Sequence, residues 1–322
     1  MAYTAVVTGA SGYVATEVVK QLLEKGYNVR GTVRSLSKKE KVEHLELLSA
    51  ALPGKLTLHE ADLLKPGSFD EVVKGADYVF HTASPFFTDV EDPMRDLVEP
   101  AVHGTQNVLS SVAKSKDTVK RVIQTSSFAA IVKTTAGPQN GKLYDEEDWN
   151  NESKPDKDGG YRYSKTEAEK AGWEFSKKEG VSLVCINPTF VLGPVVSKRV
   201  DATSIMHFKG FIEGTFTKIM PYQIDVRDIG RAHVRAAELP EAHGRYLTSH
   251  ASTCSTKTLS DILSKRFPQY KFPEGEDTPS KEIIDNSKVQ KELGIKLHDL
   301  AETYIDMATT LIQNGIAKPV PK

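Results

Sequence analysis

The sequence predicts an α/β fold: a doubly wound parallel sheet with a smaller, mostly helical lobe beside it. Three observations lead to this prediction. The chain has 322 residues, of which 39% are hydrophobic and 26% charged, which suits one large core and a companion domain. In its first half, short β-rich runs alternate with amphipathic stretches of helix length, the pattern of βαβ units. After Pro188, strand signals become sparse and helical patterns dominate.

Six short, largely apolar runs are predicted strands, because strands buried on both faces of a parallel sheet read as continuous apolar segments. In chain order they are residues 4–8, 28–33, 55–59, 77–82, 120–125 and 181–187. The stretches between them carry the apolar spacing of helices and can cross from one parallel strand to the next. These predicted helices lie near residues 14–23, 39–48, 69–73, 94–111 and 164–178.

The second half of the chain predicts a less regular arrangement. Residues 195–214 and the stretch from 249 to the end carry helical patterns and loops, whereas residues 222–237 predict a strand and a helix that return to the first sheet. We therefore expect residues 1–187 and 222–248 to form one domain. Residues 188–221 and 249–322 are expected to form the second lobe.

Composition and charge narrow the possible functions. Lys and Arg total 42 against 43 Asp and Glu, so there is no basic field that would attract nucleic acid or a membrane surface. No apolar stretch reaches membrane-spanning length, and no signal-peptide pattern opens the sequence. Cys185 and Cys254 offer no disulfide framework, and the histidines show no zinc-ligand spacing. We expect a cytoplasmic protein that acts on small molecules without a metal.

The strongest local motif follows the first predicted strand, where residues 8–15 read TGASGYVA. Gly9 allows a tight turn, Gly12 allows the backbone to approach a pyrophosphate, and Ala15 allows the helix to pack close to the sheet. The free amides of the helix N-terminus would hold the anion. The spacing differs from the Gly-x-Gly-x-x-Gly pattern, so an ordinary strand-to-helix turn remains the alternative.

The second predicted strand indicates which dinucleotide would bind. NAD-binding domains place an acidic residue about 20 residues beyond the glycines, but residues 25–39 contain no Asp or Glu. Arg34 and Lys38 stand there instead and suit a 2′-phosphate, which favours NADP(H). A solvated basic stretch is the alternative. Asp62, after the third strand, could accept from the adenine amino group or cap a helix.

Two further motifs suggest catalysis. Tyr161 and Lys165 are four residues apart at the start of a predicted helix and so lie on one face. A neighbouring ammonium favours the phenolate and would make the tyrosine a useful acid–base group. The fifth strand ends in Thr125, Ser126 and Ser127, at the sheet edge where ligands of doubly wound folds bind. A serine there could polarise a carbonyl, although paired serines also occur in plain turns.

Together with HTASPF at residues 81–86, GTQNVL at 104–109 and NPT at 187–189, these motifs resemble the extended short-chain dehydrogenase/reductase superfamily over nearly the full length. The resemblance is to the dihydroflavonol-4-reductase-like branch, which includes fungal methylglyoxal and aldehyde reductases. It implies a Rossmann-type NADP-binding domain, a substrate-binding lobe and NADPH-dependent reduction of a ketone or aldehyde. It also implies a triad of Ser127, Tyr161 and Lys165, in which Tyr161 donates the proton.

The resemblance also implies contacts to the cofactor. Arg34 and Lys38 would meet the 2′-phosphate, and Pro188 and Thr189 would border the carboxamide. The complete predicted cofactor set is Gly9, Ser11, Gly12, Tyr13, Val14, Arg34, Lys38, Asp62, Leu63, Thr82, Ala83, Ser84, Thr125, Tyr161, Lys165, Pro188 and Thr189. The apolar residues predicted to face the substrate are Phe86, Phe128, Phe190, Met206 and Phe208, with core packing as the alternative for each.

Departures from related families restrict the reaction. Epimerase-like relatives carry Asn where this chain has Ala101, and the box around the catalytic pair of cinnamoyl-CoA reductases is replaced here by DGGYRYSK at residues 158–165. The expected substrate is therefore an α-dicarbonyl, an aryl ketone or a dihydroflavonol-like compound, not a thioester. Two alternatives remain: a sugar-nucleotide epimerase or dehydratase, and a non-catalytic NADP(H)-sensing regulator. The protein is expected to be a monomer or a homodimer.

Overall fold

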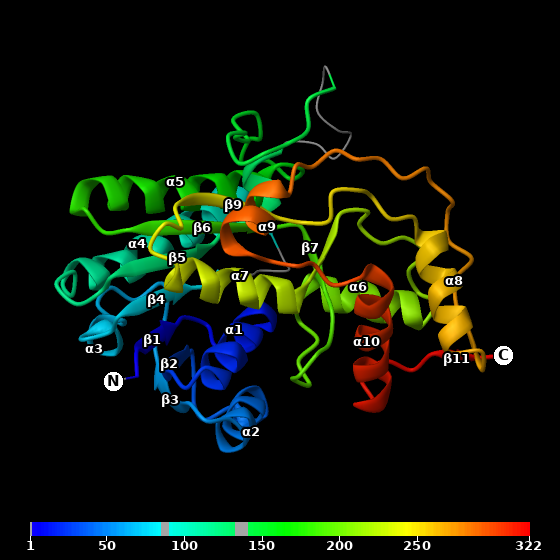
Figure 1. Cartoon of the computed structure of the whole chain (residues 1–322), viewed down its shortest axis with the longest axis horizontal. Helices are drawn as coiled ribbons and strands as arrows, with labels where there is room; N and C mark the ends of the chain where they lie inside the picture. Colours follow the sequence, from blue (N-terminus) through cyan, green and yellow to red (C-terminus); the bar gives the residue numbers. More distant parts are fainter. Residues whose placement is uncertain (1, 85–89, 133–140) are drawn as a thin grey trace.

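A computed structural model describes residues 2–84, 90–132 and 141–322 of the chain. Its central feature is a parallel sheet of seven strands in the order β3-β2-β1-β4-β5-β6-β9 (Figure 1). This confirms the predicted doubly wound α/β fold. The strands are β1 (Thr4–Val7), β2 (Asn28–Val33), β3 (Lys55–Glu60), β4 (Tyr78–His81), β5 (Arg121–Thr125), β6 (Leu183–Pro188) and β9 (Gly244–Thr248).

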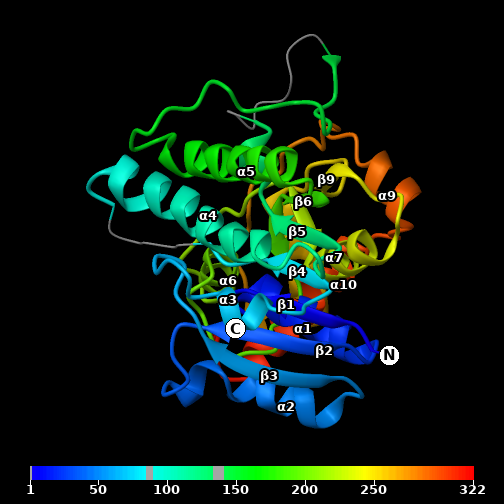
Figure 2. The same ribbon diagram turned by 90° about the vertical axis from the view of Figure 1, so that its left-hand side faces the viewer.

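Helices cover both faces of the sheet because successive strand residues point to opposite sides. In β1, Ala5 and Val7 pack in one apolar cluster and Val6 packs in another. The first cluster includes residues of α1 (Tyr13–Glu24), α2 (Glu43–Ala51), α7 (Val226–Glu238) and α9 (Ser287–Leu293). The second includes residues of α3 (Asp70–Val73), α4 (Glu99–Ala113) and α5 (Gly160–Glu179). Figure 2 shows α4 and α5 side by side on their face of the sheet.

A third apolar cluster lies at one end of the molecule, where Figure 1 shows α6, α8 and α10. It contains fully buried residues from each of these helices, such as Phe208, Leu259 and Tyr304. The elements of this region are β7 (Phe190–Leu192), α6 (Thr203–Ile212), β8 (Gln223–Asp225), α8 (Thr256–Arg266), β10 (Tyr270–Lys271), α10 (Leu300–Gln313) and β11 (Val320–Pro321). None of the helices that the structure describes is both long and apolar enough to cross a membrane.

The strand predicted after residue 222 does not join the main sheet. It is β8, which pairs in parallel with β7 as a separate two-stranded sheet. The chain returns to the main sheet one element later, because α7 packs on α1 and is followed by β9 alongside β6. Apolar residues of α9 also pack in the first apolar cluster, on the face of the main sheet that α1 and α7 cover. The division of the chain into two domains stays a prediction.

One helix boundary matters for the site. Apolar spacing predicts the helix from residue 164, but α5 begins at Gly160. Asp156 explains the earlier start, because its Oδ1 accepts from the Gly159 amide at 2.7 Å and its carbonyl accepts from Gly160 at 2.8 Å. These bonds organise the first turn before the apolar pattern begins. Tyr161 therefore lies in the first turn of α5.

Because three histidines are buried, we expect the free energy of unfolding to decrease in mild acid. Burial lowers the pKa of His44, His81 and His233 to about 4, compared with about 6.5 in an unfolded chain. Between these values the unfolded state binds more protons, so the stability present above pH 6.5 is lost as the pH falls toward 4. Each histidine contributes up to about 1.4 kcal/mol per pH unit in this window.

Urea unfolding at intervals from pH 6.5 to pH 5, above the usual pKa values of exposed carboxylates, measures this slope. His44→Gln, which keeps an amide near Thr16, is expected to remove the part of the slope that His44 contributes, up to about 1.4 kcal/mol per pH unit. Exposed His103 provides the control, since His103→Gln should leave the slope unchanged. A flat profile in the wild-type protein would contradict the prediction.

Candidate active site

The glycine turn between β1 and α1 forms a cradle that larger residues would fill. Gly9 has φ +63°, and a Cβ at this position would lie 3.0 Å from Ala83 Cβ. The turn is closed by the Gly12 amide, which donates to the Gly9 carbonyl at 2.8 Å. Gly12 then caps α1 and has no side chain to accept from its first amides. These amides and the helix dipole favour an anion.

A buried histidine fixes the neighbouring end of β4. The Ala83 amide donates to Thr8 Oγ1 at 3.0 Å, and Thr8 Oγ1 lies 3.1 Å from His81 Nδ1. Nε2 of the same ring lies 3.2 Å from Thr105 Oγ1, which donates to the Ala101 carbonyl. The two hydroxyls are satisfied if His81 is neutral with the proton on Nε2. Ala83 is thereby held against the glycine turn.

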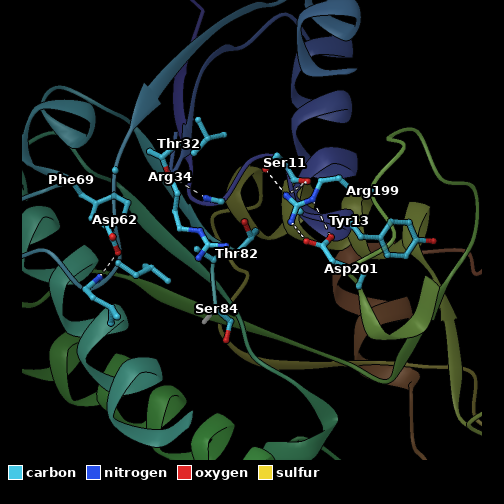
Figure 3. A pocket seen from close by; sticks show the side chains of 18 of the residues that line it. Ser11, Tyr13, Thr32, Arg34, Asp62, Phe69, Thr82, Ser84, Arg199 and Asp201 are labelled. Carbon is cyan, nitrogen blue, oxygen red and sulfur yellow. Dashed lines mark hydrogen bonds and ion pairs between the residues drawn. The ribbon is translucent and has the colours of Figure 1, made fainter. Parts of the chain in front are cut away.

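A cavity of about 380 Å³ opens beside this turn (Figure 3). Arg34 extends from the end of β2 into its lining, and Asp62 stands across from it after β3. Asp62 Oδ1 also accepts from the Leu64 amide at 2.9 Å, so this carboxylate holds a local turn as well. Predicted cofactor residues in the lining are Gly9, Ser11, Gly12, Tyr13, Arg34, Asp62, Leu63, Thr82, Ala83 and Ser84. Exposed Lys38 lies outside the lining, and its contact with a 2′-phosphate stays a prediction.

A second cavity, of about 740 Å³, shares part of this lining and contains the predicted catalytic residues Ser127 and Tyr161. Tyr161 is 49% exposed, and Lys165 Nζ lies 5.8 Å from the centre of its ring. Lys165 Nζ also donates to Ser84 Oγ at 2.9 Å, and both residues line a small adjoining cavity. Further predicted cofactor residues in the 740 Å³ cavity are Val14, Thr125, Pro188 and Thr189. Residues from β1, β4, β5, β6 and α5 therefore meet at one edge of the sheet.

The two neighbouring serines have different surroundings. Ser126 is buried, and its hydroxyl donates to Glu169 Oε2 at 2.5 Å. Ser127 lines the 740 Å³ cavity, and its Oγ accepts from the Ala129 amide at 3.1 Å. Only Ser127 of this pair belongs to the lining of the cavity that Tyr161 also lines.

A buried ion pair close to Ser126 joins α5 to the sheet. Glu169 is fully buried on α5, and its Oε1 accepts from Arg245 Nε of β9 at 2.6 Å. Its two oxygens also accept from Asn187 Nδ2 at 2.8 Å and from Trp173 Nε1 at 3.1 Å. Together with the bond from Ser126, these contacts satisfy a charge that would otherwise be costly to bury. They fix the end of β5 relative to α5.

The substrate-facing set is only partly as predicted. Phe128 and Phe190 line the 740 Å³ cavity, as predicted. The prediction for Phe208 was wrong, because this residue is fully buried and its ring centre lies 6.4 Å from that of Tyr304. On α6 the residues of the lining are Thr203, Ser204 and His207, which lie on one face of the helix. Met206 and Phe208 are not in this lining. Phe86 lies outside the described residues.

Sequence reasoning missed several lining residues. The His207 ring makes an edge contact with Phe190 and a tilted contact with Phe216, with ring centres 5.9 and 5.0 Å away. Met220 and Tyr222 also line the 740 Å³ cavity, and Arg199 and Asp201 line the smaller one. All of these residues follow Pro188, where no motif marks the chain. The one signal in the sequence was that residue 222 begins a stretch predicted to contain a strand.

Comparison with known proteins identifies related sequences along most of the chain. The sequence pattern of the NAD dependent epimerase/dehydratase family matches residues 5–247. A cinnamoyl-CoA reductase from Medicago truncatula is 38% identical over 318 residues, which are 97% of this chain and 96% of that protein. An anthocyanidin reductase from Vitis vinifera is 38% identical and aligns over 90% of this chain and 89% of its own length.

Solved structures agree with these matches. The structure of yeast methylglyoxal/isovaleraldehyde reductase complexed with NADPH superimposes with a TM-score of 0.85 and 32% sequence identity. The alignment covers 97% of this chain and 99% of the yeast enzyme. The bound NADPH of that structure belongs to the yeast enzyme, whose fold this chain shares throughout.

Proposed function

The chain belongs to the NAD dependent epimerase/dehydratase family, and from that premise we propose that it is an NADPH-dependent carbonyl reductase with Tyr161 as proton donor. Its relatives confirm the predicted resemblance to the dihydroflavonol-4-reductase-like branch. The observation that carries the proposal is the convergence of Tyr161 and Ser127 on one cavity. That cavity shares Gly9, Gly12 and Tyr13 with the cavity at the glycine turn.

The residues present fit a dinucleotide. A Cβ at Gly9 would crowd Ala83, so the turn is built for close approach of a pyrophosphate to backbone amides. Arg34 offers a guanidinium at the end of β2, where a 2′-phosphate would stand. Bound NADPH would supply a hydride from its nicotinamide.

The protein groups have separate tasks in the proposed reaction. Ser127 Oγ accepts from the Ala129 amide, which leaves its own O–H free to donate and to stabilise the developing alkoxide. Tyr161 would give its phenolic proton to that oxygen. The ammonium of Lys165, beside the Tyr161 ring, stabilises the phenolate that remains. Its bond to Ser84 holds it in place.

The cavity wall suggests the substrate class. Phe128 and Phe190 line it together with Val132, Met220 and Tyr222, a predominantly apolar surface that suits a neutral molecule. An aryl ketone, an α-dicarbonyl or a dihydroflavonol-like compound fits this chemistry. Several relatives are named for cinnamoyl-CoA, but the sequence DGGYRYSK at residues 158–165 departs from their box, and a thioester is not part of the proposal.

The cofactor preference is expected to depend on Arg34. Arg34→Ala removes a bidentate donor to the 2′-phosphate, so the Kd for NADPH should rise about tenfold to a hundredfold. The Kd for NADH should change less than about twofold, because NADH carries no such phosphate. Fluorescence titration of both nucleotides measures the two constants. Equal weakening of NADH and NADPH would contradict a role at the 2′-phosphate.

The proposal is tested by mixing the purified protein with NADPH, and separately with NADH, and following nicotinamide absorbance. The substrates are aldehydes, α-dicarbonyls, aryl ketones and a dihydroflavonol. Substrate-dependent oxidation that is faster with NADPH is the expected result. Tight NADPH binding without oxidation of the cofactor by any substrate would contradict it and favour a nucleotide-sensing role.

A further inference from the structure

Arg199 lies far along the chain but contacts the glycine turn. It lies in the segment between β7 and α6, which is anchored where the Val195 amide donates to Thr310 Oγ1 at 3.0 Å. Its Nη1 donates to the Ser11 carbonyl at 3.0 Å and to Ser11 Oγ at 2.7 Å. Figure 3 shows the guanidinium against the turn, at the lining of the 380 Å³ cavity. A positive charge far along the chain is thus brought to the predicted phosphate site.

The partner of Arg199 shows which kind of ligand suits it. Nε of Arg199 donates to Asp201 Oδ1 at 3.1 Å, and its Nη2 donates to Asp201 Oδ2. This parallel pair of bonds is the geometry in which a guanidinium also binds phosphate oxygens. The Asp201 side chain is 57% exposed, so the ion pair is screened by solvent and adds little stability. A phosphate with greater charge could therefore replace this carboxylate.

The charges around the cavity support the same conclusion. The charged residues of its described lining are Arg34, Asp62, Arg199 and Asp201. Arg34 directly follows β2 and lies apart from Arg199 in Figure 3. NADP(H) carries negative charge at two places, the pyrophosphate and the 2′-phosphate. Two separate cations therefore match it.

On the premise that this cavity binds NADP(H), we propose that Arg199 is a phosphate-binding residue of the cofactor site, supplied by the segment between β7 and α6. On binding, its guanidinium would exchange Asp201 for phosphate oxygens. Asp201 would act against binding, because its carboxylate competes for the guanidinium and repels the phosphate. The two residues therefore have opposite expected effects on affinity.

Equilibrium binding tests the proposal without relying on turnover. NADPH and NADH are titrated by fluorescence into the wild-type protein, Arg199→Ala and Lys198→Ala. Loss of a charge-assisted bidentate contact is expected to raise the Kd of Arg199→Ala about tenfold to a hundredfold. Lys198 is the matched control, since it is the exposed neighbouring cation and should matter less than about twofold. Asp201→Asn is expected to bind NADPH more tightly than wild type.

The two nucleotides show which phosphate is bound. Equal weakening of NADPH and NADH in Arg199→Ala assigns Arg199 to the pyrophosphate, and weakening confined to NADPH assigns it to the 2′-phosphate; both support the proposal. Arg199→Lys, which keeps the charge, should retain part of the affinity and replaces Arg199→Ala if that variant does not fold. Thermal unfolding without nucleotide verifies folding.

Three results would overturn the proposal: unchanged affinity of Arg199→Ala for both nucleotides, equal losses in Lys198→Ala, or weakening by Asp201→Asn as large as that by Arg199→Ala. The last would mean that the ion pair only holds the segment in shape. These failures are distinct from failure of the proposed function. If the wild-type protein bound neither nucleotide, the cofactor site itself would be wrong.

Discussion

Tyr161→Phe is expected to lower kcat for carbonyl reduction by about 10³-fold, in the range typical for loss of a general acid. The substitution removes only the phenolic hydroxyl. Tyr161 lines the 740 Å³ cavity with Ser127, and 49% of its surface is exposed, so the ring can remain in place. NADPH affinity should stay within about twofold, because the glycine turn and Arg34 are untouched.

Steady-state kinetics together with NADPH titration separate these two effects. Tyr163→Phe is the matched control: it removes a phenolic hydroxyl two residues further along α5, outside the described lining of both cavities. It should leave kcat nearly unchanged. If Tyr161→Phe kept a rate near that of wild type, another group would have to supply the proton.

Glu169→Ala is expected to lower the free energy of unfolding by about 3–5 kcal/mol, the usual cost of breaking one side of a buried ion pair. Both Glu169 and Arg245 are almost completely buried. Loss of the carboxylate would leave the guanidinium of Arg245 with an uncompensated charge. Ser126 Oγ, Trp173 Nε1 and Asn187 Nδ2 would lose an acceptor at the same time.

Urea unfolding near neutral pH measures this loss. Glu167→Ala is the control on the same helix, since its pair with Lys170 is partly exposed, and such pairs contribute about 0.2–1 kcal/mol. Apolar replacement of both partners, Glu169→Leu with Arg245→Met, should recover part of the loss because no charge stays buried. A loss below about 1 kcal/mol in Glu169→Ala would contradict the account of this ion pair.

The parts of the fold that were predictable are those determined by local pattern. Residues 28–33 are apolar on a strand period and form β2 with those bounds. The motif at residues 8–15 requires glycine at Gly9, which has a positive φ in the structure. Tyr161 and Lys165 share a helix face because their spacing is about one helical turn. Each of these inferences uses residues close together in the sequence.

The parts that were not predictable depend on contacts between distant residues. Arg199 meets Ser11 from a segment without a motif, and the pairing of β7 with β8 becomes visible only after folding. Phe208 was one of the apolar residues predicted to face the substrate, with core packing as the alternative. Its actual direction is determined by packing against Tyr304 of α10, and a single sequence does not show which face of α6 that helix covers.

The central claim is hydride transfer from NADPH to a carbonyl carbon, and isotope transfer tests it most directly. The protein is incubated with a ketone that it turns over and with NADPH carrying deuterium at both positions of nicotinamide C4. Mass spectrometry then locates the label in the product. One deuterium bound to the carbinol carbon is the predicted result. An unlabelled product, with both deuterium atoms still in the nicotinamide, would contradict the claim, because the cofactor would then not have supplied the hydride.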